Sequence, residues 1–461
     1  MGTEMERDHS WRKPPVVPVN PPKPGSPTNR ILFLTDMHWD PYYTPGLTND
    51  CGEPLCCRPP NPKATNESTA AGNWGDYQCD VPYRTLESLM QFIAGMSDEF
   101  DWVYWTGDLP AHYVWNQTRE NQLYIMDTLC DMMKQYLPDK IVFPSLGNHE
   151  GVPVNAFPPP FVTGENGDSW LLTDASRQWY SWLSQLPDWD TTHNTITYGG
   201  FYNVRVREGL RVISLQTNFA NSGNYWLLIN STDPAGQLKW LVEQLLQAER
   251  DVDKVHIIGH IFPSSYMKEF GWNYHKIVTR FESTITGQFF GHTHQDSWQV
   301  FFDDSNRTRA TNVAYMGPAV TTYQGLNLGF RIYTMDGNYN GTSNALLDHE
   351  SYWLNLTEAN LKDKAEWKFE YSAKEAYGLG SLQPQEWARL IDRFKTDDAL
   401  FQKFWDYKYK MHAGPCDAGC RASAICGLQR TRTDSPFPCT DLPLGMTMDD
   451  VLRHLAKDIM C

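Results

Sequence analysis

The sequence has 461 residues, a length that suggests two to four domains. Hydrophobic residues make up 41% of it and charged residues 20%, so disorder of the whole chain is excluded. Acidic residues outnumber basic ones by 55 to 39, and the net charge of −16 argues against nucleic acid as the main partner. We find no apolar run of about 18 residues, so no transmembrane span is expected.

Residues 1–29 are predicted to be an N-terminal tail and a proline-rich linker. The start, MGTEMERDHSWRK, lacks the apolar stretch of a signal peptide. The segment PPVVPVNPPKPGSP is typical of a semi-rigid linker that contributes nothing to a core. Because a linker joins two parts, we expect Met1 to begin a fragment, with the folded part starting near Arg30.

Cysteines and glycosylation motifs indicate an oxidising, secretory compartment. The cysteines cluster in two short windows: Cys51, Cys56, Cys57 and Cys79, then Cys416, Cys420, Cys426 and Cys439. N-x-S/T motifs begin at Asn66, Asn116, Asn230, Asn306, Asn340 and Asn355.

From Arg30 onward, short apolar runs alternate with helical patterns. The predicted buried strands are Ile31–Thr35, Trp102–Thr106, Ile141–Leu146, Val255–Gly259 and Gln288–Gly291. Apolar residues repeat at helical spacing within 86–93, 126–133 and 238–245. This alternation predicts an α/β domain over residues 30–370. The stretch 185–230 is more strand-like, which makes a second sheet plausible.

After residue 370 the pattern becomes helical. Apolar faces occur at 387–394 and 400–405, and the second cysteine cluster follows. We therefore predict a small, disulfide-stapled helical subdomain over 371–461. A tryptophan-rich helix is also predicted around Trp170, Trp179, Trp182 and Trp189, mainly facing the core, with a lipid-facing rim as the alternative.

Residues of the types that commonly bind metals follow all five predicted strands. The strands run into Asp36-Met37-His38, Gly107-Asp108, Gly147-Asn148-His149-Glu150, His260 and His292-Thr293-His294. Ligands of α/β sheets bind beyond the carboxyl ends of the strands, so we expect these side chains to converge at one sheet edge. Their mixture of oxygen and nitrogen atoms suits two borderline divalent metals.

The ordered set D-x-H, G-D, G-N-H-E, G-H and G-H-x-H resembles the signature of the calcineurin-like metallophosphoesterases. The resemblance implies a sandwich of two mixed β-sheets flanked by helices. It further implies that Asp36, His38, Asp108 and His294 hold one metal and that Asn148, His260, His292 and the bridging Asp108 hold the other. Two metals about 3.5–4 Å apart clamp a phosphoryl group and turn a bridging water into a hydroxide that attacks phosphorus in line.

A phosphodiester's leaving alkoxide needs a proton, and histidine is its usual donor. Two histidines outside the implied ligand set are candidates: His112, four residues after Asp108, and His149, next to Asn148. Which of them is the general acid is left open.

A closer resemblance spans about residues 30 to 440 and is carried by segments such as ILFLTDMHWDPYY, CGEPLCCR, YWTGDLPAH and GNHEGVPVNAFPPPF. These are similar to the acid sphingomyelinase family. The resemblance implies a zinc-dependent enzyme, with two Zn²⁺, that hydrolyses sphingomyelin to ceramide and phosphocholine. It implies a lysosomal or secreted monomer that works in acid on membrane or lipoprotein surfaces. In that family a saposin-like domain precedes the linker.

The resemblance also implies four disulfides: Cys51–Cys56, Cys57–Cys79, Cys416–Cys420 and Cys426–Cys439. A further family bridge has lost both cysteines, at the positions of Ala220 and Tyr266. We expect Cys130, on an apolar helical face, to be a buried free thiol, and Cys461 to be a bystander.

Two alternatives are weighed. The first is an acid-sphingomyelinase-like phosphodiesterase that prefers nucleotides; CGEPLCC and the proline-rich linker favour the sphingomyelinase. The second is a catalytically dead lipid-binding protein, against which all seven ligand positions are intact. For lipid contact, the candidate apolar rims are Phe157–Phe161 and Phe270–Tyr274, with internal packing as the alternative.

Overall fold

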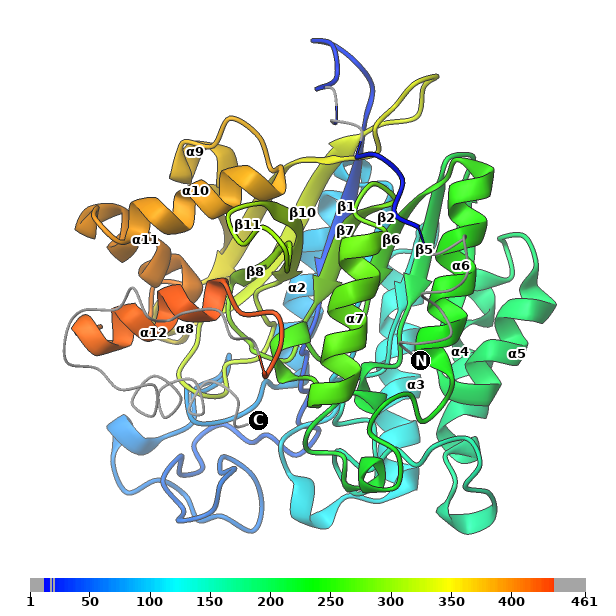
Figure 1. Ribbon diagram of the computed structural model, residues 1–461. Coiled ribbons are helices and arrows are strands. Elements are labelled where there is room, and N and C mark those ends of the chain that lie inside the picture. The colour runs from blue at the N-terminus through cyan, green and yellow to red at the C-terminus, as the bar shows by residue number, and fades with distance from the viewer. Residues whose placement is uncertain (1–11, 17–18, 20, 435–461) are drawn as a thin grey trace.

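The computed structural model describes residues 12–16, 19 and 21–434. Two mixed, six-stranded sheets pack face to face, with helices on their outer sides (Figure 1). The first sheet has the order β12-β11-β10-β1-β2-β3 and the second the order β4-β5-β6-β7-β9-β8. This confirms the expected sandwich.

In the first sheet, β1, β2 and β3 are parallel, while β10, β11 and β12 add antiparallel neighbours. Its strands are β1 (Thr28–Leu34), β2 (Trp102–Trp105), β3 (Ile141–Pro144), β10 (Leu328–Asp336), β11 (Leu346–Leu354) and β12 (Trp367–Ser372). In the second sheet, β5, β6, β7 and β9 are parallel, and β4 and β8 are antiparallel. Its strands are β4 (Tyr202–Arg207), β5 (Leu210–Ser214), β6 (Lys254–Ile258), β7 (Ile285–Phe290), β8 (Ser297–Phe302) and β9 (Ala310–Met316).

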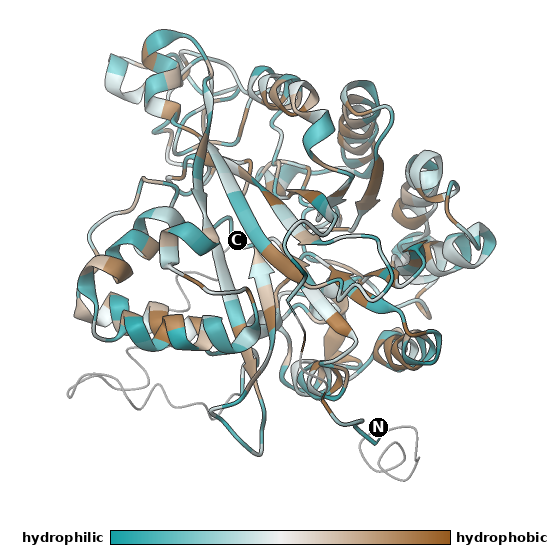
Figure 2. Ribbon diagram, turned by 90° about the horizontal axis from the view of Figure 1, so that it is seen from above, coloured by the Kyte–Doolittle hydropathy of each residue, from teal (hydrophilic) through white to brown (hydrophobic). Residues whose placement is uncertain are grey.

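Aromatic side chains fill the space between the sheets. The ring of Tyr104 on β2 lies 5.1 Å from that of Phe289 on β7, and its hydroxyl lies 2.8 Å from His256 Nδ1 on β6. His256 is therefore a buried structural residue. Seen from above, apolar residues recur along the central strands (Figure 2). This shared core holds the two sheets, and the site between their ends, in one fixed arrangement.

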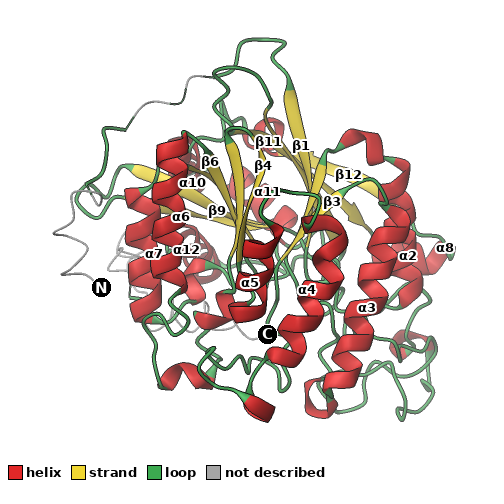
Figure 3. Cartoon of the chain, turned by 90° about the vertical axis from the view of Figure 1, so that its right-hand side faces the viewer, coloured by secondary structure: helices red, strands yellow, loops and turns green. Residues whose placement is uncertain are grey.

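The helices bury one apolar face each, as the sequence predicts. Leu86, Leu89, Met90 and Ile93 are buried on α2, and Trp387, Leu390, Ile391 and Phe394 on α10. Figure 3 shows α2, α3 and α4 side by side over one sheet. The helices are α2 (Tyr83–Gly95), α3 (Arg119–Tyr136), α4 (Ser169–Leu183), α5 (Trp189–Gly199), α6 (Gln237–Asp251), α7 (Lys268–Arg280), α8 (Leu356–Lys362), α9 (Ala373–Tyr377), α10 (Pro384–Phe394), α11 (Asp398–Lys408) and α12 (Ala418–Leu428).

One expectation about local structure is wrong. The tryptophan-rich stretch forms two helices, α4 and α5, instead of one, because the chain takes a left-handed conformation at Asp188 between them. Trp179 and Trp182 are each only 3% exposed, so they belong to the core, as expected, and form no lipid-facing rim. The stretch 185–230 begins with α5 and supplies β4 and β5 to the second sheet that its sequence made plausible.

The C-terminal helices share the core of the preceding domain. Trp387 on α10 packs against Trp298 on β8, with ring centroids 4.5 Å apart and the rings tilted by 45°. Strand β12 spans the expected boundary at residue 370. The proposed division into 30–370 and 371–461 stays a prediction.

Three of the expected disulfides are present: Cys51–Cys56, Cys57–Cys79 and Cys416–Cys420. The partner expected for Cys426, Cys439, lies outside the described residues, as does Cys461. Cys130 is a buried free thiol, as predicted. Within the described part of the chain, no helix is long and apolar enough to cross a membrane.

Candidate metal centre

The seven candidate ligands lie together, but not at one sheet edge. Asp36 and His38 follow β1, Asp108 follows β2 and Asn148 follows β3, all in the first sheet. His260 follows β6, and His292 and His294 follow β7, in the second. The expectation of a single edge is wrong because the predicted strands divide between two sheets that face each other. None of the seven residues is more than 5% exposed.

Most of these residues have strained backbone. The φ angles are positive at Asp36 (51°), His38 (39°), Asp108 (55°), His292 (73°) and His294 (57°). Residues other than glycine rarely adopt this region, and such strain tends to persist where function requires it. The strand ends are therefore bent so that these side chains turn toward a common point.

Glycines let the ligand loops approach closely. Gly107, directly before Asp108, has φ of +83°. A Cβ on Gly147 would lie 2.1 Å from Asp108 Oδ1, so no larger residue fits beside that carboxylate. Glycine is thus required at position 147 for space beside Asp108.

Hydrogen bonds define the ring nitrogens that face the centre. His38 Nδ1 lies 2.8 Å from the carbonyl of Pro110, and His260 Nδ1 lies 2.7 Å from that of Thr106. Because a carbonyl can only accept, both Nδ1 atoms carry a proton and donate it. In the neutral rings, each Nε2 therefore presents a lone pair to the centre.

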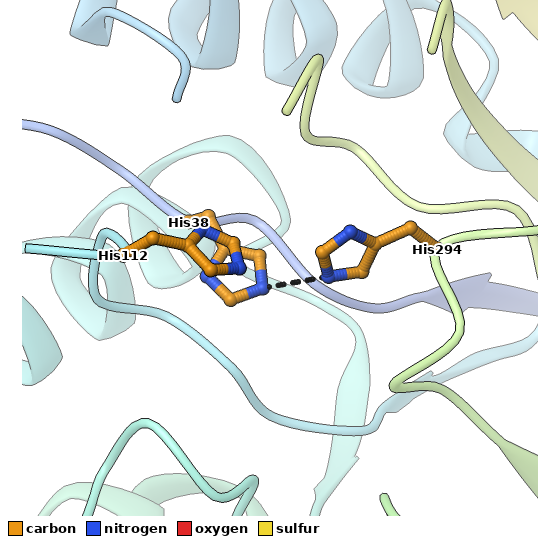
Figure 4. Close-up of side chains that lie close together, drawn as sticks. All are labelled: His38, His112 and His294. Atoms are coloured by element: carbon orange, nitrogen blue, oxygen red, sulfur yellow. Dashed lines mark hydrogen bonds between the residues drawn. The ribbon is translucent and has the colours of Figure 1, made fainter. Parts of the chain in front are cut away.

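Those lone pairs meet other acceptors. His260 Nε2 lies 3.0 Å from Asp108 Oδ2 and 3.0 Å from Asn148 Oδ1. His38 Nε2 lies 3.5 Å from Asp108 Oδ2 and 3.0 Å from His294 Nε2, which accepts or donates according to its tautomer (Figure 4). The pairs of acceptor atoms among these contacts repel one another unless a proton or cation lies between them. The donor set therefore fits metal ions, with Asp108 reaching both halves of the site.

The pKa shifts of the candidate ligand histidines indicate that the site favours positive charge. Burial alone would lower the pKa of His38 and of His260, but nearby carboxylates, Asp108 among them, raise both to about 9. Burial lowers the pKa of His292 to about 4 and holds that of His294 well below its usual range. The last two rings thus remain neutral and able to bind a metal.

His112 is held by a carboxylate that the sequence analysis did not single out. Its Nδ1 lies 2.9 Å from Asp80 Oδ1, and its backbone N–H donates to Asp80 Oδ2 over 2.6 Å. The ring of Tyr323 stacks on the imidazole with centroids 4.1 Å apart. Burial would raise the pKa of Asp80, but the charge and hydrogen bonds of His112 lower it. Asp80 therefore stays ionised and orients His112, whose Nε2 has no hydrogen-bond partner among the described residues.

His149 lies beside the same ring. The His112 and His149 centroids are 4.5 Å apart, and His149 is 1% exposed. Neither ring nitrogen of His149 has a hydrogen-bond partner in the described part of the protein. Burial keeps the pKa of His149 well below its usual range. An unpartnered polar ring next to the ligands is placed to meet a bound substrate.

Judged by distance alone, His112 and His149 could also be metal ligands. Nitrogens of His38, His112 and His294 lie within 4.8 Å of one another, and so do ligand atoms of His38, Asp108 and His149. Their assignment as residues that bind no metal stays a prediction.

Glu150 is a second residue whose role the sequence did not reveal. Its carboxylate accepts hydrogen bonds from the backbone N–H groups of Gly147 (2.6 Å), Leu109 (2.7 Å) and Asp108 (3.2 Å). It thereby ties the loop that carries Asn148 to the loop that carries Asp108. Burial and the charge of Asp108 raise the pKa of Glu150 to about 7.

Comparison with known proteins places this arrangement in a family. The family model described as calcineurin-like phosphoesterase matches residues 29–296. The model of the acid sphingomyelin phosphodiesterase C-terminal region matches residues 309–442. The protein is thus a metal-dependent phosphoesterase, and the residues between the ends of its two sheets are the candidate ligands for its divalent metal.

Similarity to named proteins specifies which phosphoesterase family the chain belongs to. The chain is 48% identical to the sphingomyelin phosphodiesterase of Homo sapiens and 46% identical to that of Bos taurus, in each case over 437 residues and 94% of this chain. These alignments cover 68% and 69% of the two relatives. A cyclic GMP-AMP phosphodiesterase of Mus musculus is 32% identical over 92% of this chain and 94% of its own. The chain belongs to the sphingomyelin phosphodiesterase family.

Proposed function

We propose that this chain hydrolyses sphingomyelin to ceramide and phosphocholine and that its cofactor is two zinc ions. The observation that carries the proposal is the pair of nitrogen- and oxygen-containing ligand sets that share Asp108, in a chain aligned over 94% of its length with sphingomyelin phosphodiesterases. Zinc accepts such mixed ligand sets. When bound, the metals supply a Lewis acid for the phosphoryl oxygens and lower the pKa of a coordinated water.

Residues of the protein itself position the substrate and protonate its leaving group. His112, oriented through Nδ1 by Asp80, presents Nε2 toward the metal centre. His149 presents a second imidazole 4.5 Å away, measured between ring centroids. One of them donates a proton to the departing ceramide oxygen, and the other binds the phosphoryl group. The near-complete burial of the ligands keeps bulk water from competing.

The proposed setting is a lysosome or the extracellular space, where the enzyme works as a monomer on membrane or lipoprotein surfaces. The three disulfides support an oxidising route. Five of the six predicted glycosylation asparagines are exposed, and Asn355 is half-buried at the start of α8. These positions suit glycans.

A second candidate function is hydrolysis of nucleotide phosphodiesters. It is favoured by the 32% identity to the cyclic GMP-AMP phosphodiesterase over nearly all of that protein. Both candidates use the same metal chemistry and differ in what lies outside the phosphoryl group.

Purified holoenzyme tests the proposal directly. We expect close to two zinc ions per chain and hydrolysis of sphingomyelin in detergent micelles much faster than hydrolysis of cyclic GMP-AMP. Asp108→Asn removes the shared charge and should abolish both metal binding and activity, whereas Asp98→Asn, at an exposed carboxylate, should change neither. The opposite substrate preference would select the nucleotide function. One zinc or none in fully active protein would refute the cofactor assignment.

A further inference from the structure

A short uncharged segment on the surface exposes large apolar side chains. Residues 225–229, YWLLI, form a 3-10 helix, η7 (Tyr225–Leu228), followed by Ile229. Tyr225 is 82% exposed, Leu228 80% and Ile229 61%, whereas Leu227 is buried and anchors the segment. We call Tyr225, Leu228 and Ile229 the apolar ridge. Clusters of this kind on a protein surface usually mark a binding face.

Hydrogen bonds connect the ridge to the loop that carries Asn148. Asn224, directly before it, donates from Nδ2 to the carbonyl of Asn218, over 3.0 Å. Asn218 Nδ2 donates in turn to the carbonyl of Gly147, over 3.0 Å, one residue before Asn148. The ridge therefore lies at the same end of the sandwich as the metal centre, and two hydrogen bonds separate their backbones.

Two further exposed aromatic residues border this region. Asn224 Nδ2 also donates to the carbonyl of Phe157, and Phe161 in the same loop is 58% exposed. On the other side, Ser231 donates to Glu269 on α7, and Trp272, one turn along that helix, is 37% exposed. Of the two rims expected from sequence, Phe157, Phe270 and Tyr274 are buried, so only Phe161 and Trp272 extend the apolar surface.

We propose that the apolar ridge inserts into the surface of a zwitterionic phospholipid bilayer and seats the catalytic domain on it. This inference rests on the proposed function, because a two-tailed lipid lies in a bilayer while the metal ligands are buried in the protein. The opening of the site must therefore meet the membrane, and the ridge is an exposed apolar element linked to the loop that carries Asn148. Tyrosine and tryptophan favour the boundary between apolar and wet phases.

Charge favours this partner over an anionic membrane. At pH 7 the chain carries a net charge of −16, so an acidic lipid surface repels it at that pH. The ridge itself has no charged residue. Attachment through it should therefore be apolar, strongest on neutral vesicles and little affected by salt.

Flotation of the full chain with phosphatidylcholine vesicles tests the ridge. The variant is Leu228→Ser with Ile229→Ser, and the matched control is Val252→Ser with Leu361→Ser, whose targets are 80% and 82% exposed. Removing two large apolar side chains from a lipid contact should weaken partition by about tenfold or more. The control should float like the parent protein. On vesicles containing sphingomyelin the ridge variant should lose activity in parallel, with full activity kept on soluble bis(nitrophenyl) phosphate.

Each outcome has a distinct meaning. Unchanged flotation of the ridge variant, or a parent protein that never floats, overturns the inference. A parent protein that floats through the ridge but leaves micellar sphingomyelin intact overturns the proposed function and keeps the ridge. If the double variant loses activity on the soluble diester, Tyr225→Asn replaces it as the test, since Tyr225 is 82% exposed and its removal leaves the core intact.

Discussion

Asp80 holds His112 at two points: it accepts from the imidazole Nδ1 over 2.9 Å and from the backbone N–H over 2.6 Å. A carboxylate on Nδ1 fixes the ring orientation and stabilises the protonated imidazole. Thr321 donates to the same carboxylate over 3.1 Å, so Asp80 is itself held in place. The pair is thus a prebuilt acid–base unit beside the metal ligands.

Asp80→Asn should lower kcat on sphingomyelin by about 10- to 100-fold, part of the roughly 10²–10⁴-fold that a proton donor contributes. An amide cannot accept both of His112's hydrogen bonds while stabilising its positive charge. Zinc content should stay unchanged, because Asp80 lies outside the ligand set. If Asp80 acts only through His112, the double variant with His112→Ala should be no slower than His112→Ala alone. Additive losses would show that Asp80 has an independent role.

The sequence was sufficient to predict which candidate ligands lie together but not what orients them. Each candidate ligand follows an apolar strand, so strand pattern and short motif together point to it. Asp80 follows Cys79 in a loop with no strand pattern, and its contact with His112 spans 32 residues. Glu150 belongs to a motif, yet its function depends on N–H groups from two separate loops.

The sequence also did not predict strands β8 to β12 or the exposure of the YWLLI segment. Strands β8 to β12 pair mostly as antiparallel neighbours late in the chain, and they were not separated from loops by apolar runs alone. The YWLLI segment has the composition of a buried strand. Its turn is fixed by Asn224, which caps η7 by accepting from the Trp226 N–H and donates to the carbonyls of Phe157 and Asn218.

Substitution of His149 or His112 by alanine should distinguish their roles through the leaving group. Ceramide leaves as a strongly basic alkoxide and needs a proton, whereas nitrophenolate leaves without one. The variant that lacks the proton donor should lose about 10²–10⁴-fold on sphingomyelin and be partly rescued on a nitrophenyl phosphocholine ester. The other variant should lose both activities alike. If both variants keep two zincs and near-full activity on sphingomyelin, neither histidine is the acid.

Glu150→Gln should loosen the metal centre while keeping the size of the side chain. Both carboxylate oxygens accept backbone N–H groups, so the amide nitrogen of glutamine must face one of those donors in either orientation. We expect metal affinity and activity to fall by about 10- to 100-fold, the typical effect of losing a residue that positions ligands. Zinc titration with a competing chelator measures the affinity. Glu243→Gln, at an exposed position on α6, serves as the control, and equal affinities in the two variants would contradict the assignment.

Asp168→Asn should change how stability depends on pH. Asp168 precedes α4 and makes no side-chain capping hydrogen bond there; burial raises its pKa from 3.8 to about 8, against the opposing charge of Arg119. Between these two pH values the carboxyl is protonated in the folded state and ionised in the unfolded state. The folded state then binds more protons, so this group's contribution to stability is complete below pH 3.8 and is lost as pH rises toward 8.

An asparagine is uncharged throughout, so the melting temperature of the Asp168→Asn variant should rise relative to the parent protein's as pH increases from 4 to 8. Asn194→Gln, at an exposed position on α5, changes no titrating group and should shift the melting temperature by the same amount at every pH. Calorimetric scans at constant zinc and ionic strength measure both series, and a difference for Asp168→Asn that is constant or falls with pH would show that this carboxyl is ionised in the folded protein.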